Sequence, residues 1–318
     1  MADTAPYAST LAADAARVTE LAAIASYAQI GRGDEKQADQ LAVDAMRTAL
    51  NSLDIDGKIV IGEGERDEAP MLYIGEKVGT GKGPAIDIAL DPLEGTTLTA
   101  KAMANALCVL SMSAGGGMLH APDTYMDKIA IGPGFAPGTV DLDMKPQENV
   151  RSLASAKGVN PSDITVCVMD RPRHAELIAA LREVGAKVML ITDGDVAGVI
   201  HTAEPETGID LYLGSGGAPE GVLAASALKC VGGHFPGRLI FRTDDERARA
   251  QRTGVTDFDR KYDLHELVSK DAVFAATGVT KGAMLDGVLV RDGFVSTHTL
   301  VMDSSTRTVR RIRMTRPI

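Results

Sequence analysis

The sequence predicts a mixed α/β protein with two sheet-containing halves. In the first half, helical and strand patterns follow one another without strict alternation, which is typical of an α+β arrangement. In the second half, a strand, a polar turn and a helix occur in this order three times, which predicts a parallel sheet with crossover helices. Because a polar stretch near residues 145–161 separates the two patterns, we expect one domain over residues 1–155 and another over 156–318.

Two helices are expected before the first strand. Residues 10–28 carry apolar side chains at helical spacing, and this pattern ends at the glycine-rich segment Gly31–Asp34. A second helix is expected over residues 36–50, with Asp39 in its first turn.

Short apolar runs then predict strands at residues 59–61, 84–90, 105–113 and 128–132. An acidic turn over residues 62–70, which contains Glu63 and Asp67, follows the first of them and leads into a helix expected at 71–77. The second strand is expected to stop at Asp91-Pro92, because proline removes a ladder donor and fixes φ.

In the second half, the strands expected at 164–169, 187–192 and 209–213 each lead into a polar turn and a helix. In such sheets ligands bind at the carboxyl ends of the strands, which is where these turns lie. A charged helix is expected at 244–252, and the basic run 309–314 predicts an edge strand.

The composition limits both the partners and the compartment. A net charge of −10 over 318 residues argues against general nucleic-acid binding. The three cysteines, at 108, 167 and 230, lie in apolar runs without metal-ligand spacing, which favours a reducing compartment. We find no signal-like start and no apolar stretch long enough for a bilayer, so we expect a cytoplasmic protein without a membrane partner.

Several polar turns carry carboxylates that the fold does not obviously need. Asp91 and Glu94 are three residues apart, with Gly95 and Thr96 directly after them. Further carboxylates occur at Asp39, Glu63, Asp67, Asp193, Asp195 and Glu220. Oxygen ligands without His or Cys spacing indicate Mg²⁺ or Mn²⁺ rather than zinc. The alternative for the turn at Asp91 and Glu94 is an acidic surface turn, and Asp193-Gly-Asp195 taken alone is more often a helix cap than a site.

Cationic and glycine-rich turns in the second half suit an anion. Arg171-Pro172-Arg173 stands at a helix start, where guanidinium groups and backbone N–H groups bind phosphate well. The glycine-rich turn 214–221 lets its backbone approach an anion closely, although it is not a Walker loop. Tyr125 either lies over a sugar or packs in the core.

These motifs resemble those of a known enzyme family. Asp-Pro-Leu-Glu-Gly-Thr at 91–96, with Gly-Glu63 upstream, resembles the lithium-sensitive, metal-dependent phosphatases, which include inositol monophosphatases and fructose bisphosphatases. The longer stretches are similar to class II (GlpX-type) fructose-1,6-bisphosphatases: Gly-Arg-Gly-Asp34, Ile-Val-Ile-Gly-Glu63-Gly-Glu-Arg-Asp67, Arg171-Pro-Arg-His, Thr192-Asp-Gly-Asp195 and Gly-Gly-Ala-Pro-Glu220-Gly. The resemblance implies a layered α-β-α-β-α sugar-phosphatase fold.

The resemblance also implies residue roles. It implies one metal at Asp39 and Glu63, and a second at Asp91, Glu94 and Glu220. It implies substrate contacts from Glu94, Gly95, Thr96, Tyr125, Arg171, Pro172, Arg173, Asp193, Gly194, Asp195 and Gly217. Asp67 and Thr96 are implied in turnover, with Thr96, oriented by Asp67 or Asp39, positioning a water.

The implied activity is metal-dependent hydrolysis of the 1-phosphate of fructose-1,6-bisphosphate in gluconeogenesis, with Mn²⁺ or Mg²⁺ as cofactor. Sedoheptulose-1,7-bisphosphate is a second implied substrate, and a dimer or tetramer is the implied assembly. The alternatives are an inositol-monophosphatase-like phosphatase of the superfamily and a non-catalytic sugar-phosphate sensor. The sequence leaves open the preferred sugar, the metal, the effectors, the oligomeric state and the role of Lys36, which follows Gly-Asp34-Glu here instead of the more common Gly-Asp.

Overall fold

The structure is a computed structural model that describes residues 5–64, 71–252 and 254–318, with side chains from residue 11. Its contacts group the chain into two compact units: unit 1, Met1–His120 with Val268–Ile318, and unit 2, Ala121–Leu267. This division does not coincide with the boundary expected at residues 155 and 156. The reason is strand pairing, because the C-terminal strand β11 (Ala272–Gly278) returns to pair with β4 (Leu107–Ala114) in unit 1.

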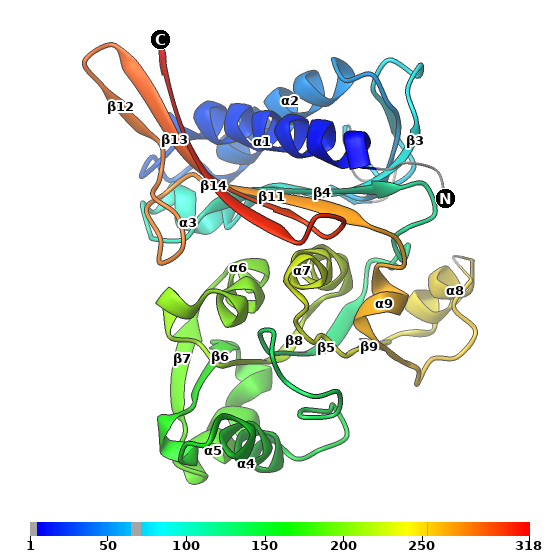
Figure 1. Ribbon diagram of the computed structural model, residues 1–318, viewed down its shortest axis with the longest axis vertical. Coiled ribbons are helices and arrows are strands. Elements are labelled where there is room, and N and C mark those ends of the chain that lie inside the picture. Colours follow the sequence, from blue (N-terminus) through cyan, green and yellow to red (C-terminus); the bar gives the residue numbers. More distant parts are fainter. Residues whose placement is uncertain (1–4, 65–70, 253) are drawn as a thin grey trace. The chain divides into compact units, whose positions relative to one another are not determined.

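In the described part of unit 1, eight strands form one sheet in the order β12-β13-β11-β4-β3-β1-β2, with β14 paired to β13. The helices α1 (Ala5–Tyr27) and α2 (Glu35–Asn51) lie on one face of this sheet (Figure 1). Alternate residues of β3, namely Ile86, Ile88 and Leu90, form a core with these helices. The remaining elements are β1 (Asp56–Ile61), β2 (Lys77–Val78), β3 (Ala85–Glu94), α3 (Thr96–Ala100), β12 (Leu289–Arg291), β13 (Phe294–Asp303) and β14 (Thr308–Pro317).

In the described part of unit 2, six strands form a sheet in the order β10-β9-β5-β8-β6-β7. Its strands are β5 (Tyr125–Ala130), β6 (Thr165–Met169), β7 (Lys187–Ile191), β8 (Leu211–Gly217), β9 (Gly237–Ile240) and β10 (Lys261–Tyr262). Helices α4 (Pro146–Lys157) and α5 (Ala175–Glu183) lie on one face, and α6 (Asp195–Ile200) and α7 (Ala218–Val231) lie on the other (Figure 1). Val166 and Val168 belong to the core with α4 and α5, whereas Cys167 between them lies against Gly198 of α6.

Shorter elements complete unit 2. They are the helices α8 (Asp244–Arg252) and α9 (Leu264–Leu267) and the 3-10 turns η1 (Pro161–Asp163), η2 (Pro172–His174), η3 (His201–Ala203) and η4 (Pro205–Thr207). The expected parallel arrangement is confirmed, because β6 pairs in parallel with both β7 and β8.

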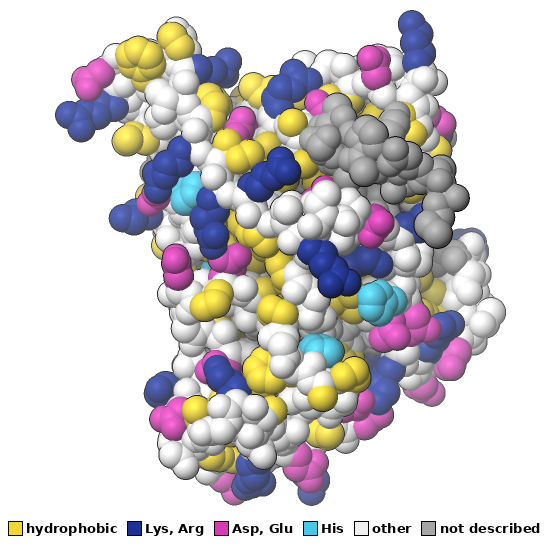
Figure 2. Space-filling model, viewed as in Figure 1, with side chains coloured by type: hydrophobic (Ala, Val, Ile, Leu, Met, Phe, Trp, Pro, Cys, Tyr) yellow, Lys and Arg dark blue, Asp and Glu magenta, His cyan; other side chains and the backbone are white. Residues whose placement is uncertain are grey.

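The basic edge strand is also confirmed. β14 pairs with β13 along its whole length, from Asp303↔Thr308 to Phe294↔Pro317. Most of its side chains are exposed, and Lys and Arg side chains gather over this region of unit 1 in Figure 2.

One prediction about the strand before Asp91 is wrong. β3 does not stop at Asp91-Pro92 but runs on to Glu94, because its pairing with β4 resumes after a register shift. Asp91 pairs with Val109 and Glu94 pairs with Leu107, so Pro92 lies in a β-bulge, where the missing N–H costs no ladder hydrogen bond.

Two further local predictions are wrong. The helix expected at 71–77 is replaced by turns and β2, because Leu72 and Gly75 adopt φ values of 54° and 94°, which no right-handed helix allows. The glycines at 214, 216 and 217 belong to strand β8 rather than to a turn, and α7 begins directly after them at Ala218.

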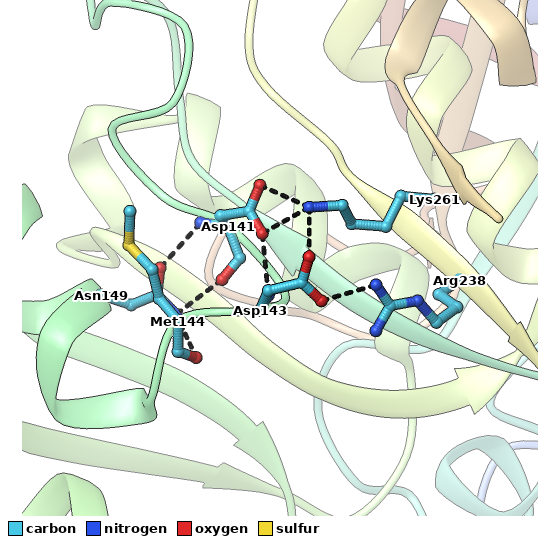
Figure 3. A network of polar contacts seen from close by, with 6 residues as sticks. All are labelled: Asp141, Asp143, Met144, Asn149, Arg238 and Lys261. Carbon is cyan, nitrogen blue, oxygen red and sulfur yellow. Dashed lines mark hydrogen bonds and ion pairs between the residues drawn. The ribbon is translucent and has the colours of Figure 1, made fainter. Parts of the chain in front are cut away.

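A polar network fixes the connection between β5 and α4 to the edge of the unit 2 sheet (Figure 3). The Lys261 ammonium lies 2.7 Å from an oxygen of Asp141 and 2.6 Å from one of Asp143, and the Arg238 guanidinium lies 2.6 Å from Asp143. Asn149 of α4 donates to the Asp141 carbonyl at 3.0 Å. Since Arg238 and Lys261 belong to β9 and β10, these bonds tie the start of α4 to those two strands.

Within residues 5–64, 71–252 and 254–318, no helix combines the length and the apolar character needed to cross a bilayer. Cys108, Cys167 and Cys230 are buried free thiols.

Candidate active site

Three carboxylates of unit 1 come together where two neighbouring strands end. β1 and β3 pair in parallel up to Ile61↔Ala89, so Glu63 and Asp91, each two residues further on, leave the same edge of the sheet. Asp39 lies in α2, which packs on β3. All three side chains are partly buried.

The pKa values show that these carboxylates interact. Burial and then the charge of Asp91 raise the pKa of Asp39 to about 6. Burial, followed by the charges of Asp91 and Asp39, raises the pKa of Glu63 to about 9. Cys108 lies close by, since burial and then the same two aspartates raise the pKa of its thiol. Three carboxylates held this way destabilise the fold unless protons or a cation neutralise them.

The chemistry of this carboxylate cluster fits a hard divalent cation. Its donors are carboxylate oxygens, which Mg²⁺ and Mn²⁺ prefer. Among the residues that the structure describes, no three His, Cys, Asp or Glu side chains lie close enough, as they stand, to hold an ion. The carboxylates would therefore have to turn toward an ion that binds them.

The bulge in β3 sets the positions of the next predicted residues. Asp91 accepts a hydrogen bond from the backbone N–H of Leu93 at 3.0 Å, and Glu94 is only 4% exposed. Gly95, with φ at 89°, turns the chain into α3, whose first residue is Thr96. This left-handed conformation suits glycine, and it lets helix and strand follow one another directly. Asp67 lies outside the described residues.

In unit 2, the predicted residues gather around the end of β8. Tyr125 pairs with Gly217 of β8 on one side and with Ile240 of β9 on the other. The Arg173 guanidinium lies 5.0 Å from the centre of the Tyr125 ring and donates to the Ser215 carbonyl at 2.6 Å. The structure therefore brings Tyr125, Arg173 and Gly217 together.

Two charged residues of this group were missed by sequence reasoning. The Arg242 guanidinium lies 4.3 Å from the centre of the Tyr125 ring, in a segment without any recognisable motif. Lys128 is completely buried and forms an ion pair with Asp195 at 2.6 Å. The alternation of β5 was the only signal for Lys128, because it places a lysine at a core position. A buried ion pair is costly to break, so Lys128 holds Asp195 in place.

The glycines of β8 leave room for these side chains. A Cβ atom on Gly216 would lie 2.1 Å from an Asp195 oxygen, and one on Gly217 would lie 1.9 Å from Oε2 of Glu220, in the first turn of α7. Glycine is thus favoured at positions 216 and 217 because the carboxylates of Asp195 and Glu220 lie close to the backbone there, and not because the chain turns.

His174 has a structural role beside this site. Its Nδ1 is 2.7 Å from the Met169 carbonyl, and its Nε2 accepts the Ser215 N–H at 2.9 Å, which fixes the neutral tautomer with hydrogen on Nδ1. Burial, the main cause, lowers its pKa. His174 therefore holds η2, which carries Pro172 and Arg173, against β8.

The other predicted residues lie on nearby turns of unit 2. Arg171 precedes η2 and donates to the Asp170 carbonyl at 3.2 Å. Asp193 accepts the Gly194 N–H at 3.1 Å, and Gly194, with φ at 83°, leads into α6. Both turns follow parallel strands, β6 and β7, as expected.

A pocket of about 450 Å³ in unit 1 lies among residues of the β13 region, including His298 and Arg313. The lining of this pocket contains none of the predicted site residues.

Comparison with known proteins agrees with the motifs. A family model described as "Bacterial fructose-1,6-bisphosphatase, glpX-encoded" matches residues 9–316. The chain is 46% identical over 317 residues to "Fructose-1,6-bisphosphatase 1 class 2" of Escherichia coli K12, covering 95% of this chain and 94% of that protein. It is also 46% identical over 318 residues to "D-fructose 1,6-bisphosphatase class 2/sedoheptulose 1,7-bisphosphatase" of Synechococcus sp. JA-3-3Ab, covering 92% and 91%.

The carboxylate cluster predicts that Glu63→Gln stabilises the metal-free protein at high pH. The folded pKa of about 9 lies above the ordinary glutamate value of 4.5, so the cost of Glu63 to stability appears above pH 4.5 and grows until about pH 9. In a chelator at pH 8, we expect the variant to melt about 2–5 °C above the wild type, and within about 1 °C of it at pH 5.

The control is Glu206→Gln, which changes an exposed carboxylate of η4 and should not alter the melting temperature at either pH. With Mn²⁺ present, the order should reverse, because the wild type gains more from the ion. Equal melting temperatures of Glu63→Gln and wild type in chelator at pH 8 would contradict the electrostatic cost.

Proposed function

The chain belongs to the family of bacterial, glpX-encoded fructose-1,6-bisphosphatases, and we propose that it hydrolyses the 1-phosphate of fructose 1,6-bisphosphate to fructose 6-phosphate and phosphate, a step of gluconeogenesis. The observation that carries this proposal is the carboxylate cluster of Asp39, Glu63 and Asp91. All three residues lie in the part of the chain, residues 9–316, that the family model matches.

In this proposal Asp39 and Glu63 hold one divalent ion, Mn²⁺ or Mg²⁺, and Asp91 with Glu94 holds a second. Glu220 is the further ligand that we propose for the second ion. Bound ions neutralise phosphate charge and lower the pKa of a water. The raised pKa values of Asp39 and Glu63 support this assignment, because an ion would relieve the repulsion that raises them.

The other predicted residues bind and orient the sugar. We assign Arg171, Pro172 and Arg173 to the phosphate that is retained. The sugar contacts come from Glu94, Gly95, Thr96, Tyr125, Asp193, Gly194, Asp195 and Gly217. Thr96, oriented by the carboxylate of Asp67 or Asp39, positions the attacking water, so that attack occurs in line with the leaving oxygen. The proximity of Tyr125, Arg173, Asp195 and Gly217 around β8 supports their part in one site.

A second substrate is sedoheptulose 1,7-bisphosphate, which one relative of 46% identity carries in its name. We further propose a homo-oligomer, a dimer or tetramer, in the cytoplasm, where the buried thiols of Cys108, Cys167 and Cys230 stay reduced.

Asp91→Asn tests the metal-dependent function. Phosphate release is measured from fructose 1,6-bisphosphate, sedoheptulose 1,7-bisphosphate and inositol monophosphate, with Mn²⁺ and Mg²⁺ compared. We expect the wild type to favour the sugar bisphosphates and the variant to lose at least about a hundredfold in kcat, because the amide removes a charge that holds an ion.

The control is Asp292→Asn, in the exposed turn between β12 and β13, which should keep full activity. Near-normal turnover by Asp91→Asn would remove the metal assignment. Binding of the sugar phosphate without phosphate release by the wild type would favour the sensor.

Thr96→Ala tests the positioning of the water. If Thr96 acts in the transition state, kcat should fall by at least about a hundredfold while KM changes less than about threefold. A raised KM with an unchanged kcat would instead make Thr96 a binding residue. Thr97→Ala, one position further in α3, serves as the neighbouring control.

Gly217→Ala tests the position of Glu220. The added methyl group would meet the end of a flexible side chain, 1.9 Å from Oε2, so the carboxylate should move while the fold survives. We expect a weaker apparent affinity for Mn²⁺, by about tenfold, with a melting temperature close to that of the wild type. An unchanged Mn²⁺ dependence would argue against Glu220 as a ligand.

A further inference from the structure

Arg242 reaches the predicted substrate residues through the pairing of β9 with β5. Ile240, the last residue of β9, pairs with Tyr125, the first residue of β5. Arg242 stands two residues beyond Ile240, and its guanidinium lies 4.3 Å from the centre of the Tyr125 ring. Since Tyr125 also pairs with Gly217, Arg242 and the end of β8 flank the same residue.

Two guanidinium groups therefore contact one aromatic ring. Arg173 approaches Tyr125 to 5.0 Å from η2, and Arg242 approaches it from the segment after β9. A tyrosine ring attracts cations through its face, which offsets part of the repulsion between two positive groups brought to one place. The Tyr125 ring therefore brings two cationic side chains to one place.

The Arg242 side chain is held in its position by a buried partner. Its Nη2 and Nε donate to Oε1 of Glu246 at 2.9 and 3.3 Å, and its backbone N–H donates to Oε2 at 2.5 Å. The Glu246 side chain is only 7% exposed, whereas that of Arg242 is 57% exposed. Glu246 thus holds the Nε and Nη2 edge of the guanidinium, while the Arg242 side chain as a whole stays accessible to a ligand.

We propose that Arg242 binds, together with Arg173, the phosphate group that the enzyme does not cleave, and that it thereby favours sugars that carry this phosphate over sugars that lack it. The proposal rests on the proposed function and deepens it. A phosphate dianion is best matched by more than one guanidinium. Because the protein carries a net charge of −10, local cations must supply the attraction for a bisphosphate.

The competing explanation is structural. Arg242 precedes α8 by two residues and pairs with Glu246 in the first turn of this helix, and such an ion pair can stabilise the helix start on its own. A purely structural Arg242 would change the melting temperature when replaced, but it would not distinguish between ligands whose phosphates stand at opposite ends of the sugar.

The test is calorimetric titration of the Mn²⁺-loaded full chain with fructose 6-phosphate and fructose 1-phosphate, on the Thr96→Ala background so that neither is consumed. Fructose 6-phosphate carries only the retained phosphate. We expect Arg242→Gln to raise its Kd at least about tenfold, as for the loss of a charge-assisted hydrogen bond, and to leave the Kd of fructose 1-phosphate within about twofold.

Two variants complete the design. Arg247→Gln removes an exposed arginine of α8 that pairs with Asp244, and it should change neither Kd. Arg242→Lys keeps a positive charge beside Glu246, so it should fold even if Arg242→Gln does not, and its Kd for fructose 6-phosphate should rise about threefold or more.

An unchanged Kd for fructose 6-phosphate in Arg242→Gln, or in Arg242→Lys if only that variant folds, would overturn the proposal. Equal weakening of both ligands would overturn it as well, because it would point to a general structural effect. These readouts do not depend on turnover, so a wild type that releases no phosphate would refute the proposed function without deciding the role of Arg242.

Discussion

Repulsion among buried carboxylates is the constraint on which the proposed chemistry depends. Asp39 comes from a helix, Asp91 from a strand and Glu63 from the turn after a strand, and the fold holds all three partly buried. Such a cluster lowers stability in the absence of a cation. The positions of the three carboxylates are set by the backbone of β1, β3 and α2, which is what the proposed site for divalent ions requires.

The bulge in β3 also fixes the positions of carboxylates, here those of Asp91 and Glu94. A strand that ended at Asp91 would leave Glu94 on a flexible loop, whereas the register shift keeps Glu94 paired with Leu107 and buried. Proline at position 92 fits there, because the bulge needs no N–H from it. Two of the proposed ligands are therefore carried by a sheet strand, which positions side chains more rigidly than a loop does.

In unit 2, strand β8 makes room for the residues that we propose bind the substrate, because two of its positions carry no side chain. Gly216 and Gly217 have no side chains, so Asp195 and Glu220 occupy the space beside the strand. The Ser215 carbonyl accepts a hydrogen bond from Arg173, and the Ser215 N–H donates one to Nε2 of His174. The small residues at the end of β8 thus allow the Lys128–Asp195 ion pair, the start of α7 and Arg173 to lie close to the same strand.

The sequence by itself determined the class of fold, most helices and strands, the family and the candidate carboxylates, because periodicity, turn residues and long motifs are local and survive without coordinates. The tertiary structure alone decided the bulge at Pro92, since strand pairing with β4 outweighs a local proline rule. It also decided that Arg242 and Lys128 join the predicted residues, because register across β5, β8 and β9 brings together positions more than a hundred residues apart in some cases, as with Tyr125 and Arg242. Pairing between distant strands is a property of the whole sheet, and no short stretch of sequence records it.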